Sequence, residues 1–97
     1  MLTGKQKKYL KGLAHTMSPI IQVGKNGINE TLVETVNNAL EARELIKISV
    51  LQNCLIETSE VAEALSTLTR SHEVQVIGRT IVLYRQSRTK RQIELPR

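Results

Sequence analysis

Hydrophobic positions along this 97-residue chain follow two different periods. Three stretches repeat every three to four residues, which predicts amphipathic helices. The first runs from a capping Thr3 to about Thr16, the second begins after Asn29, and the third spans about 59–71. The remaining apolar stretches are short and alternate with polar residues or turns, as strands do. The expected strands are residues 20–23, 45–51, 73–77 and 80–85.

The helical periods also predict which side chains are buried. On the first helix the apolar residues share one arc and lysines occupy the opposite arc, so one side should pack and the other should face solvent. The expected buried residues are Tyr9, Leu10, Leu13, Ala14 and Met17 on the first helix, Leu32, Val33, Val36, Ala39 and Leu40 on the second, and Val61, Ala64, Leu65 and Leu68 on the third.

The order of elements is α-β-α-β-α-β-β, without repeats or a linker, so we expect one α/β domain over residues 1–97. Strand–helix–strand units imply parallel pairing through right-handed crossovers. The last two strands meet at Gly78 and Arg79, which is typical of a type II′ hairpin. The expected fold is a four-stranded mixed sheet packed with three helices. From about residue 87 we expect a basic, mobile tail, in which "IEL" is a candidate edge strand.

Charge is segregated along the chain more strongly than its net value of +5 indicates. Residues 1–29 hold five lysines and no acid, residues 30–73 have a net charge of −5, and residues 74–97 return to +5. If the two basic ends meet in space, they form one positive surface, which attracts polyanions. The alternative interpretation is a solvated surface with a charge bias.

The residue types disfavour an enzyme, a metal site and a membrane protein. The chain has no Asp and only His15 and His72 as histidines, so a Ser-His-Asp triad is impossible. The single cysteine, Cys54, excludes an internal disulfide, fits a reducing cytoplasm and leaves few ligands for zinc. No stretch approaches the ~20 apolar residues of a membrane span. We therefore expect a cytoplasmic protein with no catalytic or metal-binding residues, no cofactor and no small-molecule substrate.

The sequence GKNG, residues 24–27, separates the first strand from the second helix. Two glycines three residues apart allow a tight turn and a close approach of a ligand backbone. Lys25 adds a mobile cation, and the following helix directs free N–H groups and its positive dipole end to the same region. KH domains hold a nucleic-acid backbone with a G-x-x-G loop. The four residues alone fit an ordinary turn equally well.

Several motifs in a fixed order give a more specific signal. The stretches "TGKQKKYLKGLAH", "PIIQVGKNGINETLV", "ARELIKI" and "VQVIGRTIVLYR", with the final "IELPR", resemble the CRM domain (chloroplast RNA splicing and ribosome maturation). The resemblance covers nearly the whole chain and is closest to the stand-alone bacterial YhbY-type form. It implies a fold similar to the C-terminal domain of translation initiation factor three, with a KH-like loop that contacts RNA. It also implies a role on ribosomal RNA in precursors of the large ribosomal subunit.

We therefore expect a monomeric RNA-binding protein that assists ribosome assembly. The loop should hold the RNA backbone, while the first helix, the hairpin and the tail should supply phosphate contacts. The expected site residues are Gly24, Lys25, Asn26, Gly27, Lys5, Lys7, Lys8, Lys11, Arg79, Arg85, Arg88, Lys90 and Arg91. One alternative is a protein-interaction module that docks on a ribosomal protein or assembly factor without direct RNA contact. A second is a binder of double-stranded DNA.

Overall fold

The secondary-structure elements follow one another in the predicted order. A computed structural model describes residues 2–97, which contain three helices and four strands. The elements are α1 (Gly4–Ala14), β1 (Ile21–Val23), α2 (Glu30–Arg43), β2 (Leu45–Val50), α3 (Thr58–Thr69), β3 (His72–Ile77) and β4 (Thr80–Tyr84).

The strands form one mixed sheet in the order β1-β2-β4-β3. β1 and β2 pair in parallel, with Ile21 opposite Ile48, and α2 connects them. β4 is antiparallel to both β2 and β3. The turn between β3 and β4 has a positive φ at Gly78 (56°) but not at Arg79, as a type II′ turn requires. The predicted mixed sheet and final hairpin are therefore confirmed.

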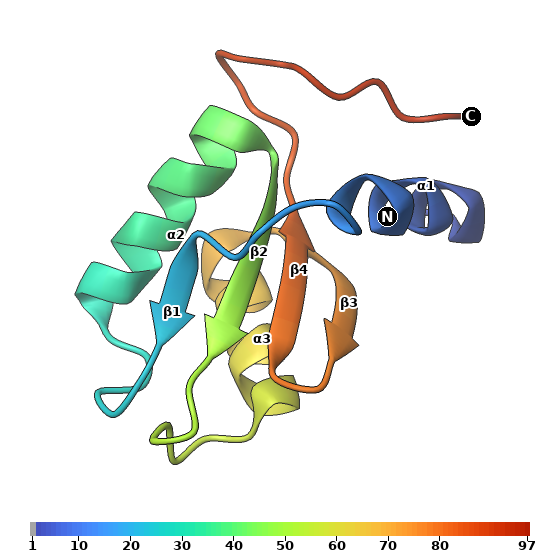
Figure 1. Cartoon of the computed structure of the whole chain (residues 1–97). Coiled ribbons are helices and arrows are strands. Elements are labelled where there is room, and N and C mark those ends of the chain that lie inside the picture. Colours follow the sequence, from blue (N-terminus) through green and yellow to red (C-terminus); the bar gives the residue numbers. More distant parts are fainter. Residues whose placement is uncertain (1) are drawn as a thin grey trace.

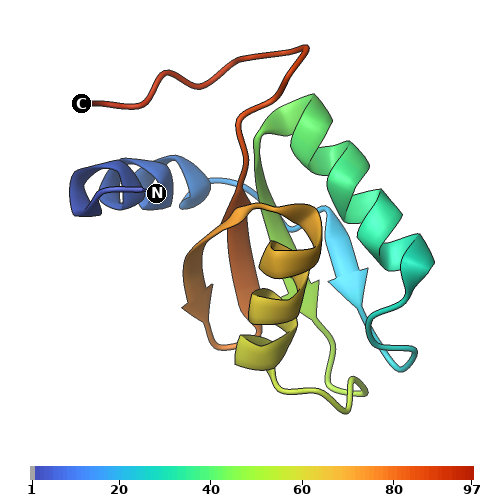
Figure 2. The same ribbon diagram turned by 180° about the vertical axis from the view of Figure 1, so that it is seen from behind.

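Two helices, α2 and α3, cover one face of the sheet (Figures 1 and 2). The alternating pattern of β2 directs Ile46, Ile48 and Val50 to this face, where they are almost completely buried. They form the larger hydrophobic core with side chains of both helices, including Leu40 and Leu65. This core fixes the parallel strands β1 and β2, from whose ends the candidate loop and its neighbour begin.

The opposite face of the sheet is covered only at one end, by α1 and the C-terminal tail (Figures 1 and 2). Leu10 and Ala14 of α1 pack there against Tyr84 and its neighbours on the sheet. Ile93 and Leu95 of the tail pack against the same cluster. The structure assigns no strand to residues 85–97, so the predicted edge strand "IEL" is wrong: its apolar side chains join a core instead.

The buried side of α1 is narrower than predicted. The helix ends at Ala14, about two residues early, with His15 as its C-cap. Tyr9 and Leu13, which we expected inside, are 42% and 37% exposed. Because α1 crosses only one end of the sheet, a single row of side chains, led by Leu10, reaches the core.

The buried side of α3 is rotated from the predicted one. Leu68 is 55% exposed, whereas Ala62 and Thr69 are buried; Ala64 is only half-buried. α3 packs both against α2 and against the β3–β4 hairpin, and this double contact turns its inner stripe. The hydroxyl of Thr69 donates a hydrogen bond to the carbonyl oxygen of Leu65 at 2.6 Å, which satisfies it in the interior.

Side-chain hydrogen bonds cap the N-terminal ends of α1 and α2. The hydroxyl of Thr3 accepts from the N–H of Gln6 at 3.1 Å, and the Gln6 amide oxygen accepts from the N–H of Thr3 at 3.0 Å. Oδ1 of Asn29 accepts from the N–H of Leu32 at 2.8 Å. Both predicted caps are confirmed, and Asn29 sets the position at which the GKNG segment must stop.

Candidate nucleic-acid interface

The GKNG segment forms a closed turn after β1. The N–H of Gly27 donates to the carbonyl oxygen of Gly24 at 3.0 Å, and Lys25 and Asn26 are exposed between them. Gly27 has a φ of 62°, in the left-handed region that favours glycine, whereas neither central residue has a positive φ. This is the pattern of a type I turn with glycine at its fourth position. The turn therefore presents Lys25 and Asn26 at a defined tip.

The loop after β2 supports this turn. β1 and β2 are parallel, so the segments that follow them leave the same end of the sheet. A Cβ atom on Gly24 would lie 3.4 Å from Oδ1 of Asn53, and one on Gly27 would lie 3.3 Å from Cδ1 of Ile56. Both glycines therefore face residues 51–56, which lie behind the turn.

Arg79 lies at the same end of the sheet as the turn. Its Nη1 donates to the carbonyl oxygen of Leu51 at 3.3 Å, which is an exposed hydrogen bond. The N–H of Leu51 in turn donates to the carbonyl oxygen of Val23 at 2.8 Å, directly before Gly24. We call this region the loop end; it comprises residues 24–27, 51–56 and 78–79.

Helix α1 lies at the opposite end of the sheet from the GKNG turn (Figure 1), and Lys11 of this helix lines a groove that extends to Ile77 and Thr80 beside the hairpin turn. The tail, residues 85–97, runs beside α1, where Nε2 of Gln6 donates to the carbonyl oxygen of Pro96 at 3.0 Å. We call α1 and the tail together the tail end. Its predicted site residues with exposed side chains are Lys5, Lys7, Lys8, Lys11, Arg88, Lys90 and Arg91.

Glu41, in the last turn of α2, holds the first part of the tail. Its carboxylate accepts hydrogen bonds from the hydroxyl of Thr89 at 2.7 Å, from the N–H of Arg88 at 3.1 Å and from the hydroxyl of Ser87 at 2.9 Å. These bonds, with that of Thr89 the strongest, lower the pKa of Glu41 to about 2. A negative charge on Glu41 therefore orders a segment in which the basic side chains of Arg88 and Lys90 remain exposed.

Glu44, the C-cap of α2, holds the next part of the tail. Its buried carboxylate accepts from the N–H groups of Ser87, Gln92 and Ile93 at 2.6 to 2.8 Å. Burial opposes its ionisation, but these three bonds outweigh that effect and the pKa of Glu44 is lowered. The residue also has a φ of 66°, a strained value for a side-chain-bearing residue that persists only where the surroundings impose it. We call Glu41 and Glu44 the tail anchor.

Arg85 differs from the other predicted site residues because its guanidinium is used inside the protein. Nη1 donates to Oδ1 of Asn37 at 2.8 Å and to the carbonyl oxygen of Thr69 at 2.7 Å. Nη2 donates to the carbonyl oxygen of Asn37 at 3.1 Å and lies 4.0 Å from the carboxylate of Glu41. These contacts join the C-terminal half of α2 to the last residue of α3. Arg85 therefore has a structural role, and we leave it out of the interface.

The two faces of the sheet carry helices of opposite charge, as the segregated charges of the sequence suggested. α1 carries four lysines and no acid, and it lies on the side opposite α2 and α3, which hold most of the glutamates. Lys47 of β2 also faces the α1 side, where its ammonium group donates to the carbonyl oxygen of Met17 at 3.0 Å. The two basic ends of the chain do meet, at the tail end, but the GKNG turn lies apart from them.

The roles of Glu41 and Glu44 were missed by the sequence reasoning. One signal was present: both acids lie at the C-terminal end of a helix, where the helix dipole disfavours negative charge. Such a position indicates that a compensating partner exists. It does not identify that partner, which here is a backbone segment more than 40 residues away along the chain.

Other chemistry is not evident in the described residues. Across residues 2–97 we find no cluster of His, Cys and acidic side chains that could hold a metal ion. No helix in that range is long and apolar enough to cross a membrane. Cys54 is buried in the larger core, as expected of a small hydrophobic side chain.

Fold and geometry together define a class: a small α/β domain with a glycine-bounded turn and a separate cluster of free cations. Residues 2–85 match the CRS1 / YhbY (CRM) domain family. A Bacillus subtilis protein named probable RNA-binding protein YqeI is 57% identical over 96 residues, covering 99% of this chain and 100% of the relative. A Haemophilus influenzae protein named RNA-binding protein is 40% identical over 96 residues, covering 99% and 96%.

A solved structure shows the same fold. It is the hypothetical protein SAV1595 from Staphylococcus aureus, with a TM-score of 0.82 and 56% sequence identity, covering 99% of this chain and 100% of that one. This chain belongs to the CRM domain family, and the resemblance noted in the sequence is confirmed.

Proposed function

We propose that this protein binds RNA and does not catalyse a reaction. Its membership of the CRM family and the names of its relatives support an RNA partner. The proposed contacts at the loop end are Gly24, Lys25, Asn26, Gly27 and Arg79. Those at the tail end are Lys5, Lys7, Lys8, Lys11, Arg88, Lys90 and Arg91.

The observation that carries the proposal is the exposed, supported GKNG turn. Lys25 and Asn26 are exposed at its tip, whereas Gly24 and Gly27 are partly buried and face residues 51–56. A phosphate can approach this tip and accept hydrogen bonds from its N–H groups as well as from Lys25. Contacts of this kind position the RNA and do not read its sequence.

The free cations at the tail end provide the second part of the interface. Within residues 2–97 the only ion pair joins Arg85 and Glu41, so the exposed lysines of α1 are not neutralised by carboxylates. RNA that contacts both ends would cross the uncovered part of the sheet, past Lys47. We infer that the protein selects RNA by the shape of the RNA more than by its nucleotide sequence, because the RNA must reach both the loop end and the tail end.

We further propose that the RNA is ribosomal RNA in precursors of the large ribosomal subunit. On this proposal the protein acts as a monomer in the cytoplasm and assists assembly. The support is the resemblance of the whole chain to the stand-alone bacterial form of the family. A rival is docking on a ribosomal protein or assembly factor without RNA contact.

The loop assignment is tested by filter binding of Lys25→Ala/Asn26→Asp. We expect about tenfold weaker RNA binding, because the variant loses one cation and gains one anion beside a phosphate. The matched control is Arg43→Ala/Asn38→Asp on α2, where both residues are exposed and the change in charge is the same. Equal affinities of the two folded variants would reject the loop assignment.

The partner is tested by sedimenting cell lysate through a gradient before and after RNase treatment. The proposal expects this protein to migrate with large-subunit precursors and to leave them when accessible RNA is digested. Release only after proteolysis of the particle would favour the rival, in which a protein surface holds it.

A further inference from the structure

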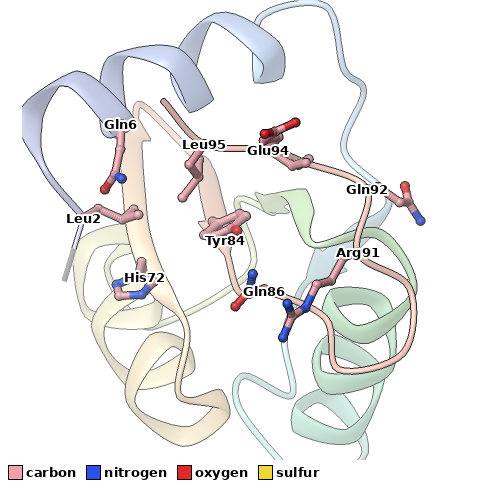
Figure 3. Close-up of a pocket in the computed structure, with 10 residues that line it drawn as sticks. Leu2, Gln6, His72, Tyr84, Gln86, Arg91, Gln92, Glu94 and Leu95 are labelled. Atoms are coloured by element: carbon pink, nitrogen blue, oxygen red, sulfur yellow. The ribbon is translucent and has the colours of Figure 1, made fainter. Parts of the chain in front are cut away.

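A cavity of about 700 Å³ lies at the tail end, between α1, the sheet and the tail (Figure 3). This volume is in the range of small-molecule sites and far exceeds the voids left by ordinary packing. Among the proposed RNA contacts, only Arg91 lines the cavity. The cavity is therefore a feature that the proposed interface does not yet explain.

One part of the lining is aromatic and apolar. The rings of His72 and Tyr84 are stacked, with centroids 6.3 Å apart and an angle of 23° between their planes. Leu2 lies beside His72 in Figure 3, and Leu95 points towards Tyr84. Ile93 completes this part of the lining. Such a surface suits a flat ligand that is poorly solvated on its faces.

The other part of the lining is polar and carries one positive and one negative side chain. Gln86 and Arg91 lie next to each other at one side of the cavity, and the carboxylate of Glu94 lies apart from the guanidinium of Arg91 (Figure 3). Arg91 makes no ion pair within residues 2–97, where the only pair is that of Arg85, although its charge helps to lower the pKa of the buried Glu44. The pKa of His72 is lowered by burial and by the nearby charge of Lys7, so its ring is neutral at pH 7 and can both donate and accept.

A nucleotide combines the features that this lining would recognise. Its base has two apolar faces and a polar edge, and its phosphate is an anion at one end. Arg and amide side chains recognise phosphates and base edges by directed hydrogen bonds, and unstacked bases pack on Tyr or His rings. The ring of Tyr84 is only 3% exposed and lies at the floor of the cavity, so the half-buried His72, which stacks on Tyr84, offers the ring surface that a base could reach.

We propose that the cavity receives one unstacked nucleotide of the bound RNA, with its base against His72 and the neighbouring side chains of Leu2 and Leu95, and its phosphate beside Arg91. This inference rests on the proposed RNA binding and adds to it a site that contacts a base. The lysines of α1 next to the cavity carry the flanking phosphates. The RNA is thus held by its backbone at the loop end and by one nucleotide at the tail end.

The tail anchor explains how the site is built before RNA arrives. Residues 91–95 form one wall of the cavity, and the N–H groups of Gln92 and Ile93 in that wall are bonded to Glu44. Because the wall is already ordered, binding does not have to order it, which improves affinity.

The test is an NMR titration of the ¹⁵N-labelled full chain with four probes: a uridine hexanucleotide, uridine 5′-monophosphate, uridine and inorganic phosphate. We expect the hexanucleotide to shift signals at residues 24–27 and also at the cavity, including the side-chain amide of Gln86 and the backbone of His72. The monophosphate should shift only the cavity signals, more weakly, and uridine and phosphate should shift them less still.

Each other outcome has a distinct meaning. Hexanucleotide shifts at the loop but not at the cavity would reject the nucleotide site and leave the proposed function standing. Equal shifts with phosphate and monophosphate would reduce the cavity to a simple anion site and overturn the proposal. Tighter binding of the monophosphate than of the hexanucleotide would make it a site for free nucleotides and overturn the RNA assignment. The absence of hexanucleotide shifts at both places would count against the proposed function itself.

A matched pair of variants gives a second readout. Arg91→Gln and Arg97→Gln each remove one exposed cation from the tail, but only Arg91 lines the cavity. Arg91→Gln should weaken binding of the monophosphate about tenfold, because a charge-assisted hydrogen bond is lost, whereas Arg97→Gln should leave it unchanged. Equal effects of the two variants would contradict the proposed position of the phosphate.

Discussion

The loop end and the tail end both present cations, but they are held in place by different kinds of contact. At the loop end, a hydrogen bond within four residues closes the turn, and the loop of the neighbouring strand packs behind it. At the tail end, a segment without secondary structure is fixed by carboxylates more than 40 residues away.

This difference has a physical consequence. The conformation of the loop end depends on backbone angles. Glycine substitutions should therefore disturb this conformation more than changes in salt concentration do. The tail end depends on charged side chains, so salt, pH and removal of a carboxylate should affect it most. A substitution should therefore be able to disturb the structure of one end and leave that of the other end intact.

Glu44→Gln should have the largest effect and should be confined to the tail end. Loss of charge-assisted bonds to three N–H groups of the tail should lower the free energy of unfolding by about 2 to 3 kcal/mol. Urea unfolding measures this value, and amide hydrogen exchange shows where protection is lost. We expect residues 87–93 to lose protection and the N–H of Gly27, which is bonded to Gly24, to keep it.

The control for this prediction is Glu34→Gln, an exposed change on the same helix, which should alter stability by less than about 0.5 kcal/mol. The cavity should also stop responding to uridine 5′-monophosphate in Glu44→Gln, because its wall is released. Unchanged protection of residues 87–93 would show that the tail does not depend on its anchor.

Gly27→Ala should destabilise the loop end more than Gly24→Ala does. Gly27 has a φ of 62°, and an added Cβ would lie 3.3 Å from Cδ1 of Ile56. The left-handed conformation costs a residue with a side chain about 1 to 2 kcal/mol. Gly24 lacks a positive φ, and its added Cβ would be at an ordinary contact distance of 3.4 Å from Asn53, so its cost should be about 0.5 kcal/mol or less. Thermal unfolding of both variants checks the order, and equal losses would contradict it.

Variants at the tail end and at the loop end should also change the salt dependence of RNA binding by different amounts. For single-stranded RNA the slope of log K against log salt changes by about 0.7 for each phosphate contact. Lys8→Gln/Lys11→Gln at the tail end should therefore reduce the slope by about 1.4, and Lys25→Ala at the loop end by about 0.7. Filter binding at several salt concentrations measures both slopes. An unchanged slope for the α1 pair would remove these lysines from the interface.

Acid should release the tail locally before it affects the loop end. The pKa of Glu41 is about 2 in the folded protein, below its ordinary value of 4.5. A carboxyl group with a lowered pKa stabilises the folded state above its ordinary pKa, and this contribution declines as pH falls from about 4.5 to about 2. NMR signals of the Arg88 and Thr89 amides should move over this range while those of residues 24–27 do not. In Glu41→Gln the pH-dependent movement of these two amides should be strongly reduced.

The fold was largely predictable because its signals are local or periodic. The alternation in β2, the caps Thr3 and Asn29 and the glycine at the last hairpin each act within a few residues, and all of them are found as predicted. The buried sides of α1 and α3 were predicted less well, since a helical period shows that a buried stripe exists but not how wide it is. The packing partners decide that: Leu13 of α1 is 37% exposed although its position on the helix places it on the apolar arc.

The sequence predicted the GKNG turn of the candidate site, but it did not reveal the contacts of the tail. GKNG could be recognised as a turn because Gly27 acts through its own backbone angle. The role of Arg85 could not be recognised, because a basic residue in a basic tail gives no sign that its guanidinium will bond to Asn37 and Thr69. The tail anchor and the cavity were missed for the same reason: each is formed by segments that are adjacent only after folding.

The sequence by itself determined the class of fold, the family, the position of the turn and the separation of basic and acidic stretches. These follow from periodicity, from backbone preferences and from motifs, which operate within short segments. Only the tertiary structure decided that the basic ends meet away from the GKNG turn, that Glu41 and Glu44 order the tail, and that Tyr84, His72 and Arg91 line one cavity. Those facts depend on the free energy of contacts between distant segments, and a local pattern does not contain that information.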